Sequence, residues 1–218
     1  MNSEPTSKTF FLLADISGYT HFMLESPVAS SHARQIIVRL LKAMISSSSL
    51  PLHVAELEGD AVFFYALADE TNAGEVGSRI RDQMLRLIHG FYAEARKLAA
   101  MNACECDACS NVGALRLKQI LHFGDAAIER VSRFDKLFGV DVILVHKLLK
   151  NSVPSNDYVL MTREAYSVIS DFHGFAPQVF RERWGAFGTV ETVVFYPTQS
   201  SGTLGPDIRQ NPAADDKD

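Results

Sequence analysis

Residues 10–20 read FFLLADISGYT and residues 57–64 read LEGDAVFF, so each stretch sets an aspartate and a glycine against an apolar run. Such a run is typical of a buried strand rather than a half-exposed one. Asp15 ends the first run, and Asp60 follows a Glu-Gly turn signal that opens the second, as in a hairpin. If the two strands are neighbours, the carboxylates of Asp15 and Asp60 converge at one rim, where Mg²⁺ can hold the phosphates of a nucleotide.

The residues that follow Asp15 favour an anion nearby. Gly18 lets the backbone come close to a ligand, and Thr20 stands near the start of a short helix whose N–H groups favour an anion. A purely structural interpretation stays open, because Asp and Gly are ordinary turn residues. In that interpretation Asp15 caps the following turn and Asp60 is a hairpin residue.

The composition of the 218-residue chain indicates one domain, or one domain with additions, with a substantial core. Apolar residues make up 47% and charged residues 22%, which is typical of a soluble globular protein. We expect no membrane association, because no run approaches the roughly 18 apolar residues of a membrane span. A net charge of −5 without a basic cluster argues against nucleic-acid binding. The first residues lack the apolar core of a signal peptide, so we expect a cytoplasmic protein.

The periodicity of the apolar residues predicts helices interspersed with hairpins. Helices are expected at about 18–25, 31–45, 75–101, 140–150 and 163–172. Strands are expected at 10–17, 52–57, 61–67, 115–122, 126–131, 157–161, 178–183 and 189–196, with hairpin turns at 58–60 and 123–125. This order predicts an α+β sandwich in which one antiparallel-rich sheet carries helices on one face. We expect residues 9–197 to form the domain, and 1–8 and 198–218 to be disordered.

Three cysteines, Cys104, Cys106 and Cys109, fall within an expected loop at 102–111. Their C-x-C-x-x-C spacing can present three thiolates to one Zn²⁺, and a histidine such as His122 could complete a tetrahedral site. The alternatives are a reduced, partly buried trio or a transient redox pair. Three cysteines this close together cannot form the disulfide framework of a small secreted domain.

Residues 11–20 resemble the opening strand and turn of class III nucleotidyl (adenylate/guanylate) cyclase domains, and residues 56–63 resemble their central hairpin, with the two aspartates 45 positions apart. The CxCxxC motif, the L-x-L-K…H-x-G pattern at 115–124 and VHKLLKN at 145–151 resemble a small bacterial family of uncharacterised cyclase-related proteins. The likeness covers roughly residues 8–196. It implies a ferredoxin-like βαββαβ core with C-terminal strand additions, and a homodimer with composite sites at its interface.

The resemblance also implies a chemistry. In active cyclases two Mg²⁺ or Mn²⁺ ions on the paired aspartates, here Asp15 and Asp60, help to activate the ribose 3′-hydroxyl. This hydroxyl attacks the α-phosphate and expels pyrophosphate. The resemblance assigns purine selection to Glu56, as in guanylyl-type enzymes, and to a position near Lys136.

Several positions depart from the cyclase pattern. The Asn that positions the ribose aligns with Ile143, which cannot hydrogen-bond. The Arg that stabilises the transition state aligns with Lys147, which keeps the charge but loses the bidentate fork. Stabilisation of that kind is worth on the order of a hundredfold in rate. Glu56 and Lys136 could also pair with each other and leave no donor–acceptor set for the purine.

We therefore expect a nucleotide or phosphate ligand, bound through Mg²⁺ or Mn²⁺, with weak or absent cyclase activity. The alternative is a non-catalytic dimeric sensor or interaction module that uses its cysteine loop for metal or redox sensing.

Overall fold

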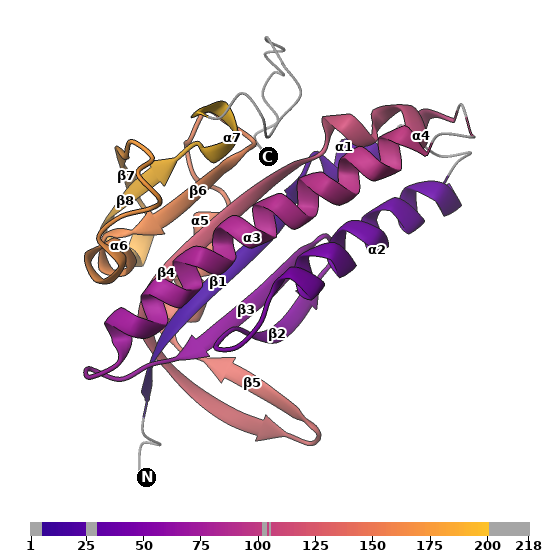
Figure 1. The fold of residues 1–218 in the computed structure, drawn as a ribbon. Coiled ribbons are helices and arrows are strands. Elements are labelled where there is room, and N and C mark those ends of the chain that lie inside the picture. The colour runs from indigo at the N-terminus through magenta and orange to yellow at the C-terminus, as the bar shows by residue number, and fades with distance from the viewer. Residues whose placement is uncertain (1–5, 25–29, 102–103, 105, 201–218) are drawn as a thin grey trace.

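A computed structural model describes residues 6–24, 30–101, 104 and 106–200. Its eight-stranded sheet has the order β2-β3-β1-β4-β6-β8-β7, with β5 paired to β4 (Figure 1). The strands are β1 (Ser7–Ser17), β2 (His53–Glu58), β3 (Ala61–Leu67), β4 (Arg116–Val131), β5 (Phe134–Phe138), β6 (Tyr158–Thr162), β7 (Gln178–Arg183) and β8 (Thr189–Phe195). The helices are α1 (Tyr19–Leu24), α2 (Ser30–Ser47), α3 (Ala73–Ala100), α4 (Asp107–Asn111), α5 (Val140–Leu148), α6 (Arg163–Ile169) and α7 (Pro197–Ser200), with 3₁₀ turns at Val112–Ala114 and Gly185–Phe187.

The first four strands and the helices between them confirm the expected ferredoxin-like core. In the order β4-β1-β3-β2 every neighbouring pair is antiparallel, and α2 and α3 provide the two crossovers of a βαββαβ unit. The expected C-terminal additions then extend the sheet: β6 runs parallel to β4, β8 antiparallel to β6 and β7 antiparallel to β8. The α+β fold predicted from the sequence is therefore confirmed.

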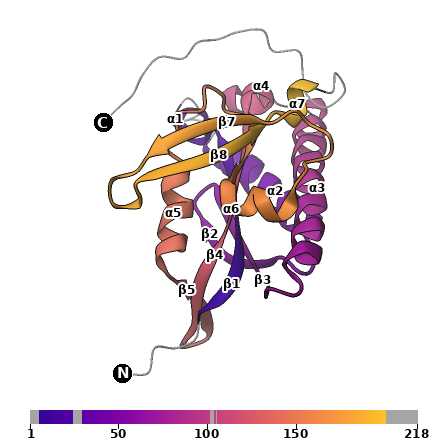
Figure 2. The same ribbon diagram turned by 90° about the vertical axis from the view of Figure 1, so that its left-hand side faces the viewer.

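Strand β1 is an inner strand of the sheet, and its side chains are buried on both faces. Phe10 and Leu12 pack with α2 and α3, whereas Phe11 and Leu13 belong to a second cluster that includes Leu148 of α5. Figure 2 shows α5 on the opposite side of the sheet from α2 and α3. The expectation that all helices share one face is wrong, because α5 buries its own apolar side against the second face.

Strand β4 is continuous where the sequence predicted a hairpin turn at 123–125. Strand β1 pairs along it without a break, with Thr9 opposite Gly124. Gly124 lets the Asp141 side chain pack closely against the backbone of β4, and it does not form a turn. A Cβ at this position would lie 2.3 Å from Asp141 Oδ2. The same Asp141 oxygen accepts a hydrogen bond from the backbone N–H of Asp125 at 2.7 Å. The hairpin lies later in the chain, between β4 and β5.

The segment at 102–111, expected to be a loop, contains the short helix α4 instead. Ala108 of α4 and the adjacent Val112 are fully buried, so the α4 region is anchored to the core on the α2–α3 face. At the two ends of the chain, β1 begins at Ser7 and α7 ends at Ser200, and the rest of the segments expected to be disordered lies outside the described residues. Within the described ranges, no helix combines the length and apolar character needed to cross a membrane.

Candidate functional site

Five residues form a row across one face of the sheet near the C-terminal end of β1. Strand pairing places Glu58 opposite Ala61, and Ala61 opposite Asp15. It also places Asp15 opposite Lys118, and Lys118 opposite Tyr158. Paired residues share a face of the sheet, and Ala61 and Tyr158 both belong to the cluster under α5. Asp15 therefore has a lysine on the next strand to one side and Glu58 two strands away on the other.

Asp60 lies in the turn between β2 and β3, beside the end of β1. The backbone N–H of Ile16 donates to the carbonyl oxygen of Asp60 at 3.3 Å, which ties this turn to the residue after Asp15. Both acids are half-buried. Burial raises the pKa of Asp15, and burial together with the negative charge of Asp15 raises the pKa of Asp60 to about 6.

These shifts provide a test of whether the two aspartates fit a divalent cation. A raised carboxyl pKa means that the ionised form is less stable in the protein than in water. A cation between Asp15 and Asp60 would offset both the loss of solvent and the repulsion between the two charges. Carboxylate oxygens are also the donors that Mg²⁺ and Mn²⁺ prefer. The donor set therefore fits the cation that the sequence predicted.

Lys118 is the site residue that the sequence interpretation missed. It is half-buried, and its positive charge acts to lower the pKa of both Asp15 and Asp60, although burial has the larger effect. An ammonium group beside two acids is suited to contact a phosphate oxygen. The alternation of β4 puts Lys118 on the face opposite its buried neighbour Leu117. Only strand pairing brings it to Asp15, and a single sequence does not specify that pairing.

A cavity of about 190 Å³ lies between β2, β5 and α5, on the same face of the sheet. Its lining includes Glu56 and Lys136, the two residues assigned to purine selection. They come from β2 and β5, and Lys136 Nζ donates to Glu56 Oε2 at 2.5 Å. The pairing considered from the sequence is thus present, and each of these two lining side chains already has a partner.

His146 of α5 connects this cavity to the row of residues. Its Nε2 lies 2.8 Å from Glu58 Oε1, and its Nδ1 lies 2.7 Å from the carbonyl oxygen of Val142. The carbonyl and carboxylate oxygens are both able to accept a hydrogen bond from a ring N–H. The ring also meets Phe63 edge-on, with 4.9 Å between centroids. His146 therefore holds Glu58 at the edge of the cavity.

The other predicted site residues lie on exposed surfaces. Gly18 has a φ of +90°, a conformation that favours glycine, and Thr20 is exposed in α1. With six residues, α1 has too short a backbone dipole to be an anion site by itself. Ile143 and Lys147 are exposed on the side of α5 turned away from the sheet. The structure therefore does not direct Lys147 towards the aspartates of its own chain.

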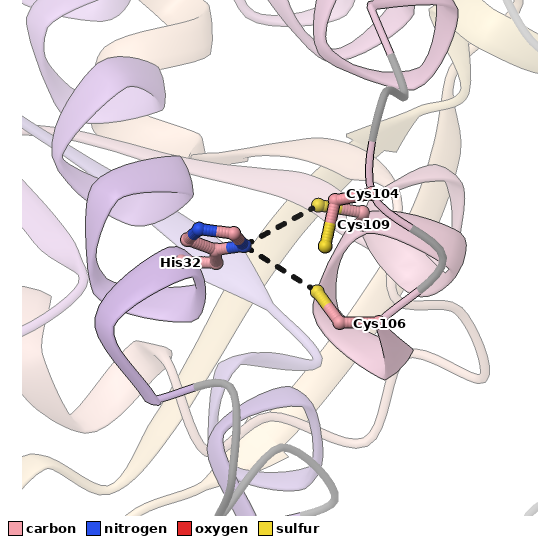
Figure 3. Close-up of side chains that lie close together, drawn as sticks. All are labelled: His32, Cys104, Cys106 and Cys109. Carbon is pink, nitrogen blue, oxygen red and sulfur yellow. Dashed lines mark hydrogen bonds between the residues drawn. The ribbon is translucent and has the colours of Figure 1, made fainter.

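The three cysteines gather around a histidine that the sequence interpretation did not consider. Figure 3 shows the sulfurs of Cys104, Cys106 and Cys109 beside the ring of His32, which comes from the start of α2. His32 Nδ1 lies 3.5 Å from Cys106 Sγ and 4.0 Å from Cys109 Sγ. No spacing rule connects position 32 to position 104, so sequence reasoning could not pair them.

His122, the histidine considered for this cluster, lies elsewhere. It is buried in β4, where Nδ1 is 2.8 Å from Thr162 Oγ1 and Nε2 is 3.3 Å from Asp141 Oδ1. That second contact has the distance of an ion pair but not the geometry of a hydrogen bond. His122 is thus a core residue, and the prediction that it completes the cysteine site is wrong.

Comparison with protein families and curated proteins gives two matches. A family model described as "Protein of unknown function (DUF2652)" matches residues 37–158, a range that includes Asp60 and the cysteines but neither Asp15 nor His32. The uncharacterized protein Rv2561/Rv2562 of Mycobacterium tuberculosis is 33% identical over 126 residues, which are 58% of this chain and 57% of that protein. The chain therefore matches little more than half the length of this relative.

Solved structures with a similar fold are class III cyclase domains. The adenylyl cyclase CyaB from Pseudomonas aeruginosa superimposes with a TM-score of 0.68 at 13% identity, over 89% of this chain and 96% of that one. A class III adenylyl cyclase-like ATP-binding protein from the same organism gives a TM-score of 0.63 at 16% identity, over 76% of this chain and 35% of that one. At such low identity these matches establish the fold alone.

Proposed function

This chain belongs to the DUF2652 family, and we propose that it is a divergent class III nucleotidyl cyclase-like domain that binds a nucleoside triphosphate or related phosphate ligand. Asp15 and Asp60 hold Mg²⁺ or Mn²⁺, and cyclase activity is weak or absent. The observation that carries this proposal is the meeting of two half-buried acids with raised pKa values at the end of β1. The cyclase fold of the solved neighbours supports it.

Each part of the site has a role in binding. When bound, the divalent cation neutralises phosphate charge and orients the phosphates. Asp15 and Asp60 supply its carboxylate ligands, and Lys118 contacts a phosphate oxygen from the neighbouring strand. The cavity lined by Glu56 and Lys136 receives the base, and Gly18 and Thr20 border the phosphates.

Two features of the chain disfavour cyclase catalysis. At the positions where active cyclases carry Asn and Arg, this chain has Ile143 and Lys147, so a hydrogen bond to the ribose and a bidentate phosphate contact are both missing. Lys147 is also exposed on the outer side of α5. It would reach a bound phosphate only in the site of a second copy, in a homodimer.

Calorimetric titration of the full chain with GTP or ATP, in the presence of Mg²⁺ or Mn²⁺, tests binding. We expect cation-dependent binding that weakens at least tenfold in Asp15→Asn and Asp60→Asn, because each variant removes one charged ligand while keeping the side-chain volume. Glu164→Gln is the matched control, since Glu164 is an exposed acid on α6, away from the cavity and the two aspartates. Chromatography of the same mixtures measures any cyclic product or pyrophosphate.

Two results would contradict the proposal. One is a wild-type chain that binds neither nucleotide with either cation. The other is binding that is the same in both aspartate variants as in the wild type and the Glu164→Gln control. Abundant cyclic product would leave the binding site in place and overturn the weak-activity part alone.

A second candidate function is a non-catalytic dimeric sensor or interaction module. The replacements at Ile143 and Lys147 favour it, because they remove the polar groups of a cyclase transition state and leave an apolar side chain on an exposed helix face. A chain that dimerises without binding nucleotide would support this function over the first.

A further inference from the structure

Three sulfur atoms and one ring nitrogen meet on the α2–α3 side of the molecule, on the other face of the sheet from Asp15. The sulfurs belong to the only cysteines of the chain, in the segment between α3 and β4. The nitrogen belongs to His32, more than seventy residues earlier, at the start of α2. The cluster therefore joins two distant segments of the chain.

The spacing of these atoms is close to that of a four-coordinate metal site. Tetrahedral Zn²⁺, with sulfur at about 2.3 Å and nitrogen at about 2.0 Å, separates neighbouring ligand atoms by about 3.5–3.8 Å. The two measured contacts of His32 Nδ1 are 3.5 and 4.0 Å, and all four ligand atoms lie within 4.8 Å of one another. An ion would have to draw the side chains together by no more than about 1 Å.

The segment that carries the cysteines is held in place by its own buried residues. Ala108 and Val112 are inserted in the core, and Cys106 packs against the same apolar cluster at its edge. Helix α4 contacts both α2 and α3. These contacts set the positions of Cys106 and Cys109 without any metal, so a binding site is preorganised.

The chemistry of the four side chains favours a soft cation. Cysteine sulfur and histidine nitrogen are the ligands that Zn²⁺ takes in closed structural sites. The cation binds cysteine as the thiolate, so its binding releases the thiol protons.

A path to solvent lies next to the cluster. A cavity of about 250 Å³ between α2 and the end of α3 is lined by His32, Cys104 and Cys109. Arg39, which is paired with Glu94 of α3, also lines it. The cavity gives an ion access to the cluster, while the four protein ligands leave no coordination position for a substrate.

We propose that His32, Cys104, Cys106 and Cys109 bind one Zn²⁺ in a closed Cys₃His site that fastens the start of α2 to the α3–β4 connection. The ion has a structural role, because all four positions of its coordination shell are protein atoms. This site is independent of the proposed nucleotide function. It differs from a redox pair, in which two of the thiols would lose two electrons and two protons to an oxidant and form a disulfide.

Metal analysis of the full-length chain, purified with a non-thiol reductant, tests the proposal. We expect about one zinc per chain, and in Co²⁺-loaded protein the thiolate-to-cobalt charge-transfer and intense visible bands of tetrahedral coordination. His32→Ala and each Cys→Ser variant should weaken zinc affinity, which chelator competition measures. Loss of a residue that only hydrogen-bonds to a metal ligand costs roughly 10–100-fold in affinity, and loss of a ligand itself should cost at least as much. His89→Ala is the matched control, since His89 is another exposed histidine on a helix.

The variants need not all fold equally well, so the readouts are paired. Zinc added to the chelated wild type should raise its midpoint of thermal unfolding, and the same addition should leave the His32→Ala midpoint unchanged. The proposal is overturned if zinc content is the same in Cys106→Ser as in the wild type. It is equally overturned if the reduced chain gives no tetrahedral Co²⁺ spectrum, or if mass spectrometry shows a disulfide that forms in air and excludes the metal.

Discussion

At the scale of single residues, the carboxyl of Asp60 predicts a pH dependence of stability. Its pKa is raised from 3.8 to about 6 by burial and by Asp15. Between these two values the unfolded chain loses the proton while the folded chain keeps it. The free energy of unfolding therefore falls as the pH rises from about 4 to about 6, and this contribution is constant above that range.

Asp60→Asn removes the loss of stability that ionisation of the Asp60 carboxyl causes. We expect the variant to exceed the wild type by about 1–2 kcal/mol in free energy of unfolding near pH 8. This is less than the ~3 kcal/mol of a two-unit shift, because Asp60 is partly exposed to solvent. The difference should vanish near pH 4, and Mg²⁺ should reduce it near pH 8 by stabilising the wild type alone. Urea unfolding across this pH range measures it, and a difference that is constant with pH would refute the explanation.

The two aspartates were predictable from the sequence, whereas Lys118 and His32 were not. Asp15 and Asp60 stand beside glycines at the ends of apolar runs, a local pattern that a single sequence shows. Lys118 reaches Asp15 through strand pairing, and His32 reaches the cysteines through the packing of α2 against α4. Both depend on contacts between distant segments, which residue spacing does not encode.

At the scale of elements, the continuity of β4 depends on Gly124. We expect Gly124→Ala to lower the free energy of unfolding by about 1–3 kcal/mol, because its Cβ would overlap the Asp141 carboxylate. Gly113→Ala is the control: nothing lies within 4 Å of a Cβ there, so it should be neutral or stabilising by up to about 1 kcal/mol. Equal urea midpoints for the two variants would show that the close approach at Gly124 has no energetic consequence.

Gly124 also explains why the predicted hairpin was wrong. A Phe-Gly-Asp sequence between two apolar runs has the composition of a turn, and local reasoning has no competing signal. The competing contacts are tertiary: β1 pairs through this segment, and Asp141 occupies the space that the missing Cβ leaves. Strands β2, β3, β7 and β8, which have clear turns between them, matched their predicted ranges to within a few residues.

At the scale of the whole molecule, the order of the elements was sufficient to predict the fold class. A strand, a helix pair, a hairpin, a long helix and another strand lead to the antiparallel order β4-β1-β3-β2. The placement of α5 on the second face was not predictable from that order. It follows from β1, whose alternate residues Phe11 and Leu13 need an apolar cover on that face as well.

The outer side of α5 is the surface where we expect a second copy of the chain. Val140 and Ile143 are 66% and 54% exposed there, and Lys147 continues the same stripe one turn further on. Leu144 and Leu148 face the sheet. Among the described residues nothing covers this stripe, so we expect a second copy to cover it and Lys147 to serve the site of that copy.

Ile143→Asp tests this arrangement. A twofold interface contains the substitution twice, and burying two unpaired carboxylates disfavours association by several kcal/mol. We expect the wild type to sediment as a dimer and Ile143→Asp as a folded monomer with an unchanged circular dichroism spectrum. Val38→Asp, at a 41% exposed position on α2, should remain dimeric. A wild type that is monomeric at every concentration, or a dimer that Ile143→Asp leaves intact, would rule out this face as the interface.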